Sequence, residues 1–300
     1  MNLPKTSNET WKACAPLVAL AAALFAGYFL ALRPRIDPTG TVLVSTLATF
    51  GALAIIGGLA MLVRSWPDAW ALTRAGAGKP PRDGRLEAFA GSLEPEGTPL
   101  EGPFTGSPCS LYEYGVEPAD GAGSDYFGIG LTPSVIRGSR GSARLLGFPT
   151  LDHLPRALVK DPELRQRAER YLAGTGSERL PTTPNSVAGL IGDFLEAAAD
   201  DDGAVRRDWR RVEFGPLCED DVVYERSLAP EASVTALGLY SAERAGLMGG
   251  GNPVQIVLGD LETARTRLVT GSRRYALAGI IWGLLLQAFF VTVWTLARGV

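Results

Sequence analysis

Cys109 is a candidate for nucleophilic chemistry. It stands in the segment GSPCSLYEYGVE at residues 106–117, between a Gly/Pro turn and an aromatic strand. A cysteine nucleophile must be deprotonated, which usually takes a histidine or a basic neighbour. The chain has one histidine, His153, and no spacing ties it to Cys109 or to Cys218. A catalytic Cys/His pair is the alternative, but we interpret Cys109 as a buried, structural thiol.

The same side chains decide whether zinc is expected. A structural zinc site needs four Cys or His ligands, commonly in closely spaced pairs. The sequence offers Cys14, Cys109, Cys218 and His153, none of them paired in this way, and Cys14 lies in an apolar segment. We therefore predict no metal and no cofactor.

Two other kinds of motif are weak. GIGLTP at residues 128–133 and GGGNP at residues 249–253 lack the spacing of a phosphate-binding loop. RRDWRR at residues 206–211 interleaves Arg and Trp, as nucleic-acid-binding segments do, but it follows three aspartates in a chain of net charge −3. We predict no nucleic-acid partner and no catalytic residue. A hydrolase or transferase with an unrecognised site is the alternative function.

Hydrophobic residues make up 46% of the chain and are concentrated in three segments. Residues 13–32 and 38–63 hold no charged side chain, and in residues 275–297 only Gln287 is strongly polar. Each segment, at about 1.5 Å per helical residue, can cross a bilayer core of roughly 30 Å. We predict three transmembrane helices, with a tight turn at residues 33–40 between the first two. A cleaved signal peptide is the alternative for the first segment.

Small residues are expected to let the first two helices pack closely. These residues are Ala22, Ala26, Gly51, Gly57 and Gly58.

Positive charges near the ends of the spans predict the orientation. With three spans, ten Lys and Arg residues lie on one side of the membrane and three on the other. The ten are Lys5, Lys12, Arg64, Arg74, Lys79, Arg82, Arg265, Arg267, Arg273 and Arg274, and the three are Arg33, Arg35 and Arg298. Because the cytoplasmic side carries the excess, we predict a multi-pass protein of the bacterial inner membrane with its main domain in the cytoplasm.

The residues between the second and third spans are predicted to form a folded domain. Short β-rich runs broken by Gly and Pro fill residues 85–147 and 205–258. Between them, residues 161–174 predict a helix that begins with an Asp cap followed by Pro, and apolar spacing in residues 185–203 predicts a second helix. A helix from residue 261 is expected to continue into the third span.

The predicted fold class is an α+β membrane protein. Three transmembrane helices accompany a β-rich, small barrel-like domain that carries a two-helix insertion and lies between spans two and three. The expected parts are the N-terminal tail and helical hairpin at residues 1–63, an interfacial linker at 64–84, the domain at 85–258, and the connecting helix with the third span at 259–300.

Two segments carry a resemblance to a known family. RLEAFAGSLEPEGTPLEGPFTGSPCSLYEYGVE at residues 85–117 and ERSLAPEASVTALGLY at residues 225–240 resemble the opening strand and the closing strand pair of the beside-a-membrane, or GIDE-type, domain. That domain occurs in mitochondrial and chloroplast membrane ubiquitin ligases and in many prokaryotic membrane proteins. The matching positions are Pro108, Cys109, Tyr112, Glu225 and Gly238.

The resemblance covers roughly residues 80–258 and implies the prokaryotic type of this domain. The eukaryotic ligases carry a zinc-binding RING after their last span, and its ligands are missing here, so ligase activity is not implied. Those ligases also hold the domain across the membrane from the cytosol, opposite to the side that the charge count favours. Side-chain alternation within the matching strand predicts Cys109 on the same face as Leu111, opposite Tyr112.

These observations favour a membrane-adjacent interaction or scaffold module. The expected partners are the lipid bilayer and another membrane or membrane-adjacent protein. Binding surfaces tend to lie on loops carried by a rigid scaffold, and two Gly-rich segments are candidates. Residues 138–144 offer Arg140 and Arg144, and residues 244–253 offer Met248 and Asn252. The alternative is that both segments only connect strands.

The orientation is testable with reporter fusions at residue 150 and at the C-terminus. We expect a cytoplasmic signal at residue 150 and an extracytoplasmic signal at the C-terminus, because the Lys and Arg excess flanks the domain. An extracytoplasmic signal at residue 150 would reverse the predicted orientation.

Overall fold

The computed structural model describes residues 7–119, 125–176, 178–179, 205–210, 217–249 and 253–298. The chain divides into two compact units. One, the helical unit, consists of Met1–Trp66 with Thr270–Val300, and the other, the β-rich unit, is Pro67–Val269.

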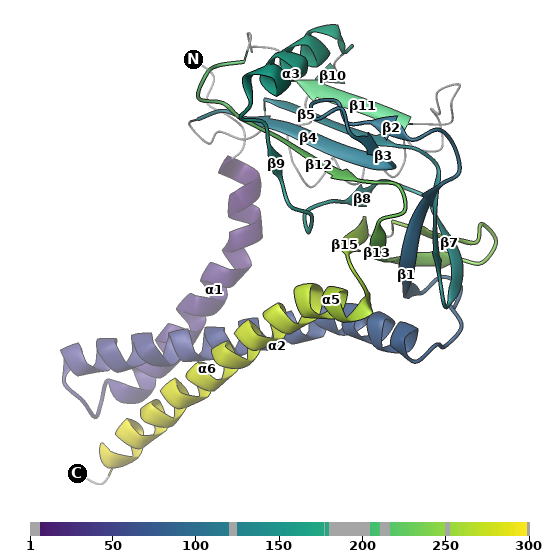
Figure 1. Ribbon diagram of the computed structural model, residues 1–300. Helices are drawn as coiled ribbons and strands as arrows, with labels where there is room; N and C mark the ends of the chain where they lie inside the picture. Colours follow the sequence, from purple (N-terminus) through teal and green to yellow (C-terminus); the bar gives the residue numbers. More distant parts are fainter. Residues whose placement is uncertain are drawn as a thin grey trace. The chain divides into compact units, whose positions relative to one another are not determined.

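The helical unit contains α1 (Ser7–Leu32), the larger part of α2 (Pro38–Gly76), and α6 (Gly271–Leu296) (Figure 1). Asp37 precedes α2 and accepts a hydrogen bond from Gly40 N at 2.9 Å, so the predicted turn also caps the helix. Pro38 takes the first helical position, where a missing N–H costs nothing.

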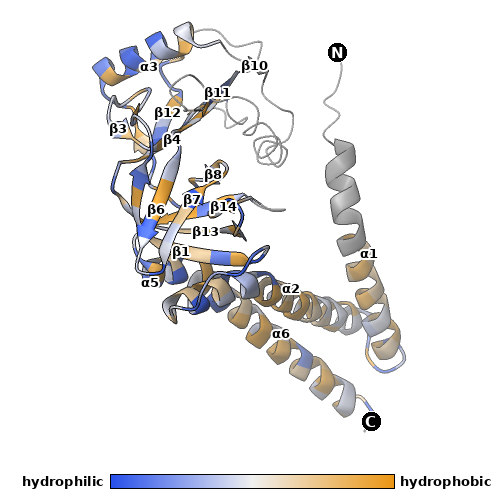
Figure 2. Cartoon of the chain, turned by 90° about the vertical axis from the view of Figure 1, so that its right-hand side faces the viewer, coloured by the Kyte–Doolittle hydropathy of each residue, from blue (hydrophilic) through white to orange (hydrophobic). Residues whose placement is uncertain are grey.

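Within the described residues, two helices are by length and composition able to cross a membrane, Pro38–Gly76 and Leu261–Leu296. The protein itself buries only 22% and 11% of their most apolar windows, and apolar residues follow both helices in Figure 2. In α1 the described apolar stretch is shorter, Val18–Leu32. Two of the three expected spans therefore have helices of the required length, and the first span stays a prediction.

Glycines bring α2 against α6. A Cβ added to Gly58 would lie 2.6 Å from the Ala276 carbonyl oxygen, and one added to Gly51 would lie 2.8 Å from Leu286 Cβ. A Cβ added to Gly57 would meet nothing within 4 Å. The prediction that Gly51 and Gly58 pack against the first helix was wrong, because they face the third long helix instead.

Gln287 links three helices through its amide. It accepts a hydrogen bond from Tyr28 Oη on α1 at 3.0 Å and donates one to the Ala48 carbonyl on α2 at 2.7 Å. The polar residue noted in the third apolar segment thus has partners within the helical unit, as a polar group in an apolar environment requires.

In the β-rich unit, one sheet closes into a barrel. Its strands follow the order β1–β6–β7–β14–β13, and β13 pairs back onto β1, while β15 and β8 extend the sheet beside β13. The strands are β1 (Leu86–Pro95), β6 (Ser134–Gly138), β7 (Gly141–Leu145), β8 (Pro149–Thr150), β13 (Ser233–Ser241), β14 (Gly246–Met248) and β15 (Val254–Leu258). The expectation of a mixed α+β chain with a barrel-like sheet is confirmed.

A second sheet has the order β10–β11–β5–β4–β12–β9, and a short β2–β3 hairpin precedes β4. The strands are β2 (Leu100–Glu101), β3 (Pro108–Cys109), β4 (Leu111–Glu117), β5 (Tyr126–Leu131), β9 (Ala157–Leu158), β10 (Glu178–Arg179), β11 (Val205–Arg210) and β12 (Val222–Leu228).

The expected closing strand pair splits between the two sheets. β12 pairs with β4 in the second sheet, whereas β13 pairs with β1 in the barrel. The turn between them holds Glu231 at φ +62°, a left-handed conformation that redirects the chain. Both strands of the prediction exist, but they do not pair with each other.

Three apolar clusters separate these layers. The first lies between the barrel and one face of the second sheet, and includes Leu93, Ile136, Leu111 and Trp209. The second covers the other face of that sheet, beneath the β2–β3 hairpin and α3 (Pro162–Gly174). The third packs the end of α2 and α5 (Leu261–Arg265) onto the barrel.

The helix Pro162–Gly174 forms where the sequence predicts it. Asp161 accepts hydrogen bonds from Glu163 N and Leu164 N, and Pro162 opens the first turn. Ala168 and Leu172 face the second apolar cluster. The second helix of the predicted insertion, at residues 185–203, lies outside the described residues.

The predicted linker at residues 64–84 is helical over much of its length, because α2 continues past Val63 to Gly76. Ala69, Leu72 and Ala75 recur every three residues and pack in the third apolar cluster. The two units meet in the sequence at helical irregularities. One is Pro67 inside α2, and the other is the π-helical turn Thr266–Thr270 between α5 and α6.

Substituting two neighbouring glycines tests the α2–α6 contact. Gly58→Leu should destabilise the detergent-solubilised chain by about 1–3 kcal/mol, because the new side chain has no room beside Ala276. Gly57→Leu is the matched control, since it gains the same helix propensity in open space. Equal thermal unfolding curves for the two variants would contradict this packing.

Candidate functional site: buried Glu87 and three arginines

Cys109 is buried, with 1% of its surface exposed, in the second apolar cluster with Tyr112 and Phe104. Leu111 belongs to the first cluster, on the opposite face of the sheet. The predicted shared face of Cys109 and Leu111 was therefore wrong. The chain bends at Ser110, between β3 and β4, and this bend resets the alternation.

The Cys109 thiol is unsuited to nucleophilic chemistry. Burial raises its pKa to about 12, with further contributions from the negative charges of Glu225 and Glu101. A nucleophilic cysteine needs the opposite shift. These surroundings support a packing role for Cys109.

Glu225 is a buried carboxylate that holds the β2–β3 loop in place. It accepts hydrogen bonds from Phe104 N at 2.8 Å, Thr105 N at 3.1 Å and Thr105 Oγ1 at 2.6 Å. A Cβ added to Gly102 would lie 2.4 Å from the same carboxylate. Glu225 therefore contacts the loop that precedes Pro108 and Cys109, so three of the positions that carry the family resemblance lie near one another.

Tyr112 belongs to a network of hydroxyls around Asp208. Its Oη lies 3.2 Å from Tyr171 Oη, and Asp208 Oδ1 accepts hydrogen bonds from Tyr114 at 2.8 Å and from Tyr171 at 3.3 Å. Burial raises the pKa of Tyr112 to about 12 and also raises the pKa of Asp208. The network joins β4, β11 and α3 by neutral phenol donors.

Glycines in β5 make room for this network. A Cβ at Gly128 would lie 2.1 Å from Tyr114 Cε1, and one at Gly130 would lie 2.4 Å from Tyr112 Cε1. The tyrosine rings therefore cross over β5 to reach the next strand. Gly238 has a related role in the barrel, where a Cβ would lie 3.0 Å from the Met248 carbonyl oxygen of β14.

The two candidate binding segments lie side by side in the barrel. β7 runs parallel to β14, with Arg144 in register with Gly246. Arg144 is exposed and its guanidinium lies 2.9 Å from Glu96. Met248 is half-buried at the end of β14. Asn252 lies outside the described residues.

Arg140 does not lie on an open loop. Residues 138–144 form the β6–β7 hairpin with a turn at Ser139 and Arg140, and the Arg140 side chain is 7% exposed. Its guanidinium donates to the Lys79 carbonyl from Nε at 2.6 Å and to the Ala88 carbonyl from Nη1 at 2.7 Å. The segment expected to be a loop is therefore a hairpin turn, and the partners of the Arg140 side chain lie inside the β-rich unit.

The remaining partner of Arg140 is Glu87, whose side chain is fully buried. Arg140 Nη2 donates to Glu87 Oε2 at 2.6 Å. The Nε atoms of Arg74 and Arg82 lie 3.5 Å and 3.7 Å from Glu87 Oε1. One buried carboxylate thus meets guanidinium groups from α2, from the connector that follows α2, and from the β6–β7 hairpin.

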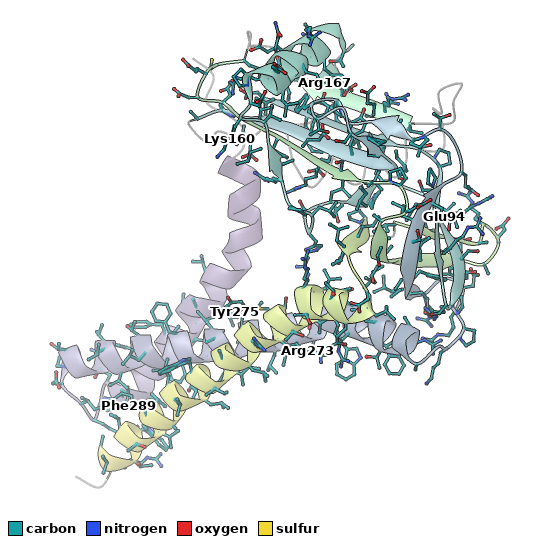
Figure 3. The ribbon with its side chains drawn as sticks, viewed as in Figure 1. Glu94, Lys160, Arg167, Arg273, Tyr275 and Phe289 are labelled. Atoms are coloured by element: carbon teal, nitrogen blue, oxygen red, sulfur yellow. The ribbon has the colours of Figure 1, made fainter. Side chains whose placement is uncertain are left out.

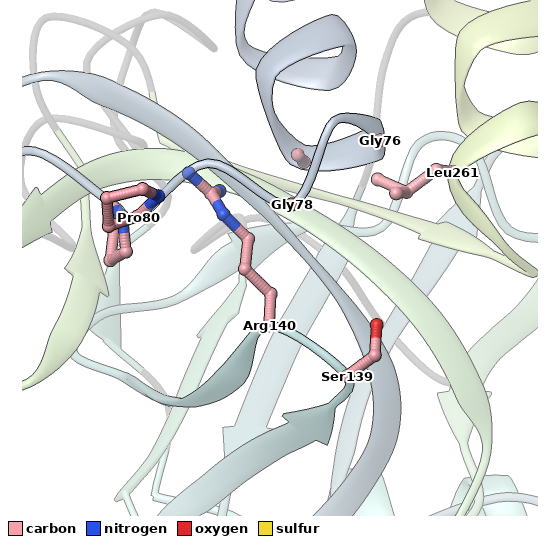
Figure 4. A pocket seen from close by; sticks show the side chains of 8 residues that line it. Gly76, Gly78, Pro80, Ser139, Arg140 and Leu261 are labelled. Atoms are coloured by element: carbon pink, nitrogen blue, oxygen red, sulfur yellow. The ribbon is translucent and has the colours of Figure 1, made fainter.

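A cavity of about 390 Å³ lies beside this cluster (Figure 4). Its lining comes from the end of α2, the connector, the β6–β7 turn and α5: Ala75, Gly76, Gly78, Pro80, Pro81, Ser139, Arg140 and Leu261. The figure shows the Arg140 side chain extending from the turn toward Pro80. All these residues belong to the β-rich unit.

The side chains around this cavity favour an anion over a cation. Arg140 is the charged residue of its lining, and Arg74 and Arg82 each precede or follow a lining residue directly. Of the two acidic neighbours of the lining residue Leu261, Asp260 caps α5 and Glu262 is exposed. In the described part of the chain, no three Cys, His, Asp or Glu side chains gather as potential metal ligands. Sequence reasoning missed this cluster because it counted Arg74 and Arg82 only as topology signals.

No known protein family, curated protein or solved structure matches the chain.

The two described free cysteines offer a test of the Cys109 environment. At pH 8 a thiol of pKa about 12 is ionised in about one molecule in ten thousand. In a Cys14→Ser background, we expect maleimide to label the exposed Cys218 and to leave Cys109 unlabelled until denaturant is added. Peptide mass spectrometry provides the measurement, and native labelling of both thiols at similar rates would refute a buried Cys109.

Proposed function

We propose that the chain is a multi-pass membrane protein whose β-rich unit is a membrane-adjacent interaction module. The observation that carries this proposal is that two apolar helices, Pro38–Gly76 and Leu261–Leu296, lie before and after the β-rich strands in the sequence and leave their apolar surface uncovered.

The uncovered surface is large for a protein in water. On α6, Tyr275 and Trp282 are 76% and 66% exposed, and Phe289 is also exposed (Figure 3). Val63 and Leu43 are among the exposed apolar residues of α2. Contiguous exposed apolar patches of soluble proteins rarely exceed a few hundred Å². Lipid is the covering that agrees with helices of this length.

The buried acidic and thiol groups support a binding role rather than catalysis. Glu225 is occupied by the β2–β3 loop, and Asp208 by two tyrosines. Burial keeps the Cys109 thiol protonated. Each of these groups therefore has a structural task that accounts for its presence in the core.

The β7–β14 surface is our proposed contact region for a membrane or membrane-adjacent protein. Arg144 projects from β7 beside the Gly246 end of β14, and the half-buried Met248 follows on the same strand. Arg144 is paired with Glu96 but exposed, and an exposed arginine on a strand beside the one that carries a soft apolar residue suits an adaptable protein contact. The resemblance to GIDE-type domains supports a membrane-adjacent module. The Lys and Arg count favours the cytoplasmic side for it, opposite to the side on which the family's ligases hold the domain.

Membrane extraction with carbonate, followed by photo-crosslinking, tests this function. We expect the full chain to stay in the membrane pellet, because its apolar helices need lipid. A photo-reactive residue at Arg144 should give a discrete protein adduct in native membranes.

The matched control places the photo-reactive residue at Arg170, which is exposed on α3. Release of the chain by carbonate would overturn the membrane assignment. The same adducts from Arg144 and Arg170, or none from Arg144, would overturn the proposed contact region.

A further inference from the structure

We propose that the cavity beside Glu87 is a binding site for a phosphate group. This site lies apart from the β7–β14 surface of the interaction module, and its ligand is a small anion rather than a protein. Four features carry the inference: an unbalanced charge, unused donors, a cavity in the right place, and the chemistry of guanidinium groups.

The charge around Glu87 is unbalanced. Three guanidinium groups, from Arg74, Arg82 and Arg140, surround one carboxylate, which leaves a surplus of two positive charges. Asp83 of the connector accepts a hydrogen bond from Ala242 N instead. The Arg74 and Arg140 side chains are 11% and 7% exposed, whereas Arg82 is 49% exposed. Buried charge is costly unless it is paired, so an anion beside the two buried guanidinium groups would relieve the surplus.

Several of the N–H donors lack acceptors among the described residues. Arg74 Nε lies 3.5 Å from Glu87 Oε1 without making a hydrogen bond, and because it is buried, a ligand would reach it only after the side chain moves. Arg140 uses one N–H from each of its three nitrogens, and a guanidinium has five. The Arg82 side chain is 49% exposed, and its ion pair with Glu87 spans 3.7 Å. Unused donors of this kind are what a phosphate oxygen needs.

The cavity has a suitable size and position. About 390 Å³ is within the range of small-ligand pockets, and it exceeds what a phosphate alone needs, so a phosphate attached to a larger group also fits. Arg140 lines the cavity, Arg74 precedes the lining residue Ala75, and Arg82 follows Pro81. Gly76 and Gly78 leave the backbone at its mouth free of side chains.

A phosphate monoester is the best match among biological anions. It carries about −1.5 to −2 charges at neutral pH, close to the surplus of two. Its tetrahedral oxygens accept bidentate hydrogen bonds from arginine. The group has two possible sources, a soluble phosphate compound and phosphatidic acid, a phospholipid whose headgroup is a phosphate monoester, and the experiment separates them.

The probes are inorganic phosphate and phosphatidic acid, applied to the full chain in nanodiscs. In phosphatidylcholine nanodiscs, inorganic phosphate at constant ionic strength should raise the melting temperature in a saturable way if the source is soluble. Nanodiscs containing phosphatidic acid should raise it without added phosphate if the source is a lipid. Either result, with the variant pattern below, supports the site.

Arg82→Gln is the main variant, because Arg82 is half-exposed and its loss leaves Glu87 paired with Arg140. We expect about tenfold weaker phosphate binding, as the loss of one charge-assisted contact predicts. Arg74→Gln is a second variant with the same expected direction. Arg137→Gln, which changes an exposed arginine on the same β6–β7 hairpin, is the matched control and should bind phosphate like the parent chain.

The inference is overturned if neither probe stabilises the parent chain, or if Arg137→Gln weakens phosphate binding as much as Arg82→Gln does. Its failure is distinguishable from failure of the proposed function, which depends on carbonate resistance and on the adduct at Arg144. If the chain stays in the membrane pellet after carbonate treatment but does not bind phosphate, the proposed interaction module stands. Glu87 and its arginines then have a structural role alone.

Discussion

The need of one buried carboxylate for partners organises the start of the β-rich unit. Glu87 is the second residue of β1, and it collects Arg74 from α2, the Arg82 backbone N–H at 3.2 Å and side chain from the connector, and Arg140 from the β6–β7 turn. Arg140 then holds the connector through the Lys79 carbonyl, and Arg74 Nη2 does so through the Pro80 carbonyl. Removing Glu87 would leave three guanidinium groups without their common anion.

Two more buried carboxylates, in the second sheet, also accept hydrogen bonds from distant segments. Glu225 is buried on β12 and collects backbone donors from the β2–β3 loop, while Asp208 on β11 collects phenol donors from β4 and α3. Each carboxylate joins segments that are distant in the sequence. Since a buried carboxylate is costly without donors, each one specifies which loop or helix must lie above its strand.

Local signals in the sequence predicted those parts of the fold that depend on interactions between residues close together in the chain. The Asp161 cap, the Pro162 start and the β-rich runs were readable because their causes lie within a few residues. The split of β12 and β13 between two sheets was not readable, since it depends on pairing with β4 and β1 far away. The face of Cys109 was missed for a smaller reason, a bend at Ser110 that no turn residue of strong preference announces. Arg140 was chosen as a candidate binding residue for its Gly-rich context, and its contact with Glu87 could not be predicted because the two residues lie 53 positions apart.

Stability alone does not account for the composition of the Glu87 cluster. A buried ion pair is at best a weak source of stability, and a single arginine would satisfy one carboxylate with less desolvation. The third apolar cluster already fastens the end of α2 and α5 to the barrel through residues such as Leu72, Val257 and Leu268. Arg140 and Arg74 also hold the connector, which this cluster does not include. The three arginines together still bring more positive charge than one carboxylate balances, next to a cavity that Arg140 lines. An excess of one sign of charge beside a cavity attracts the opposite sign, and this makes an anionic ligand a better explanation of the Glu87 cluster than a structural role alone.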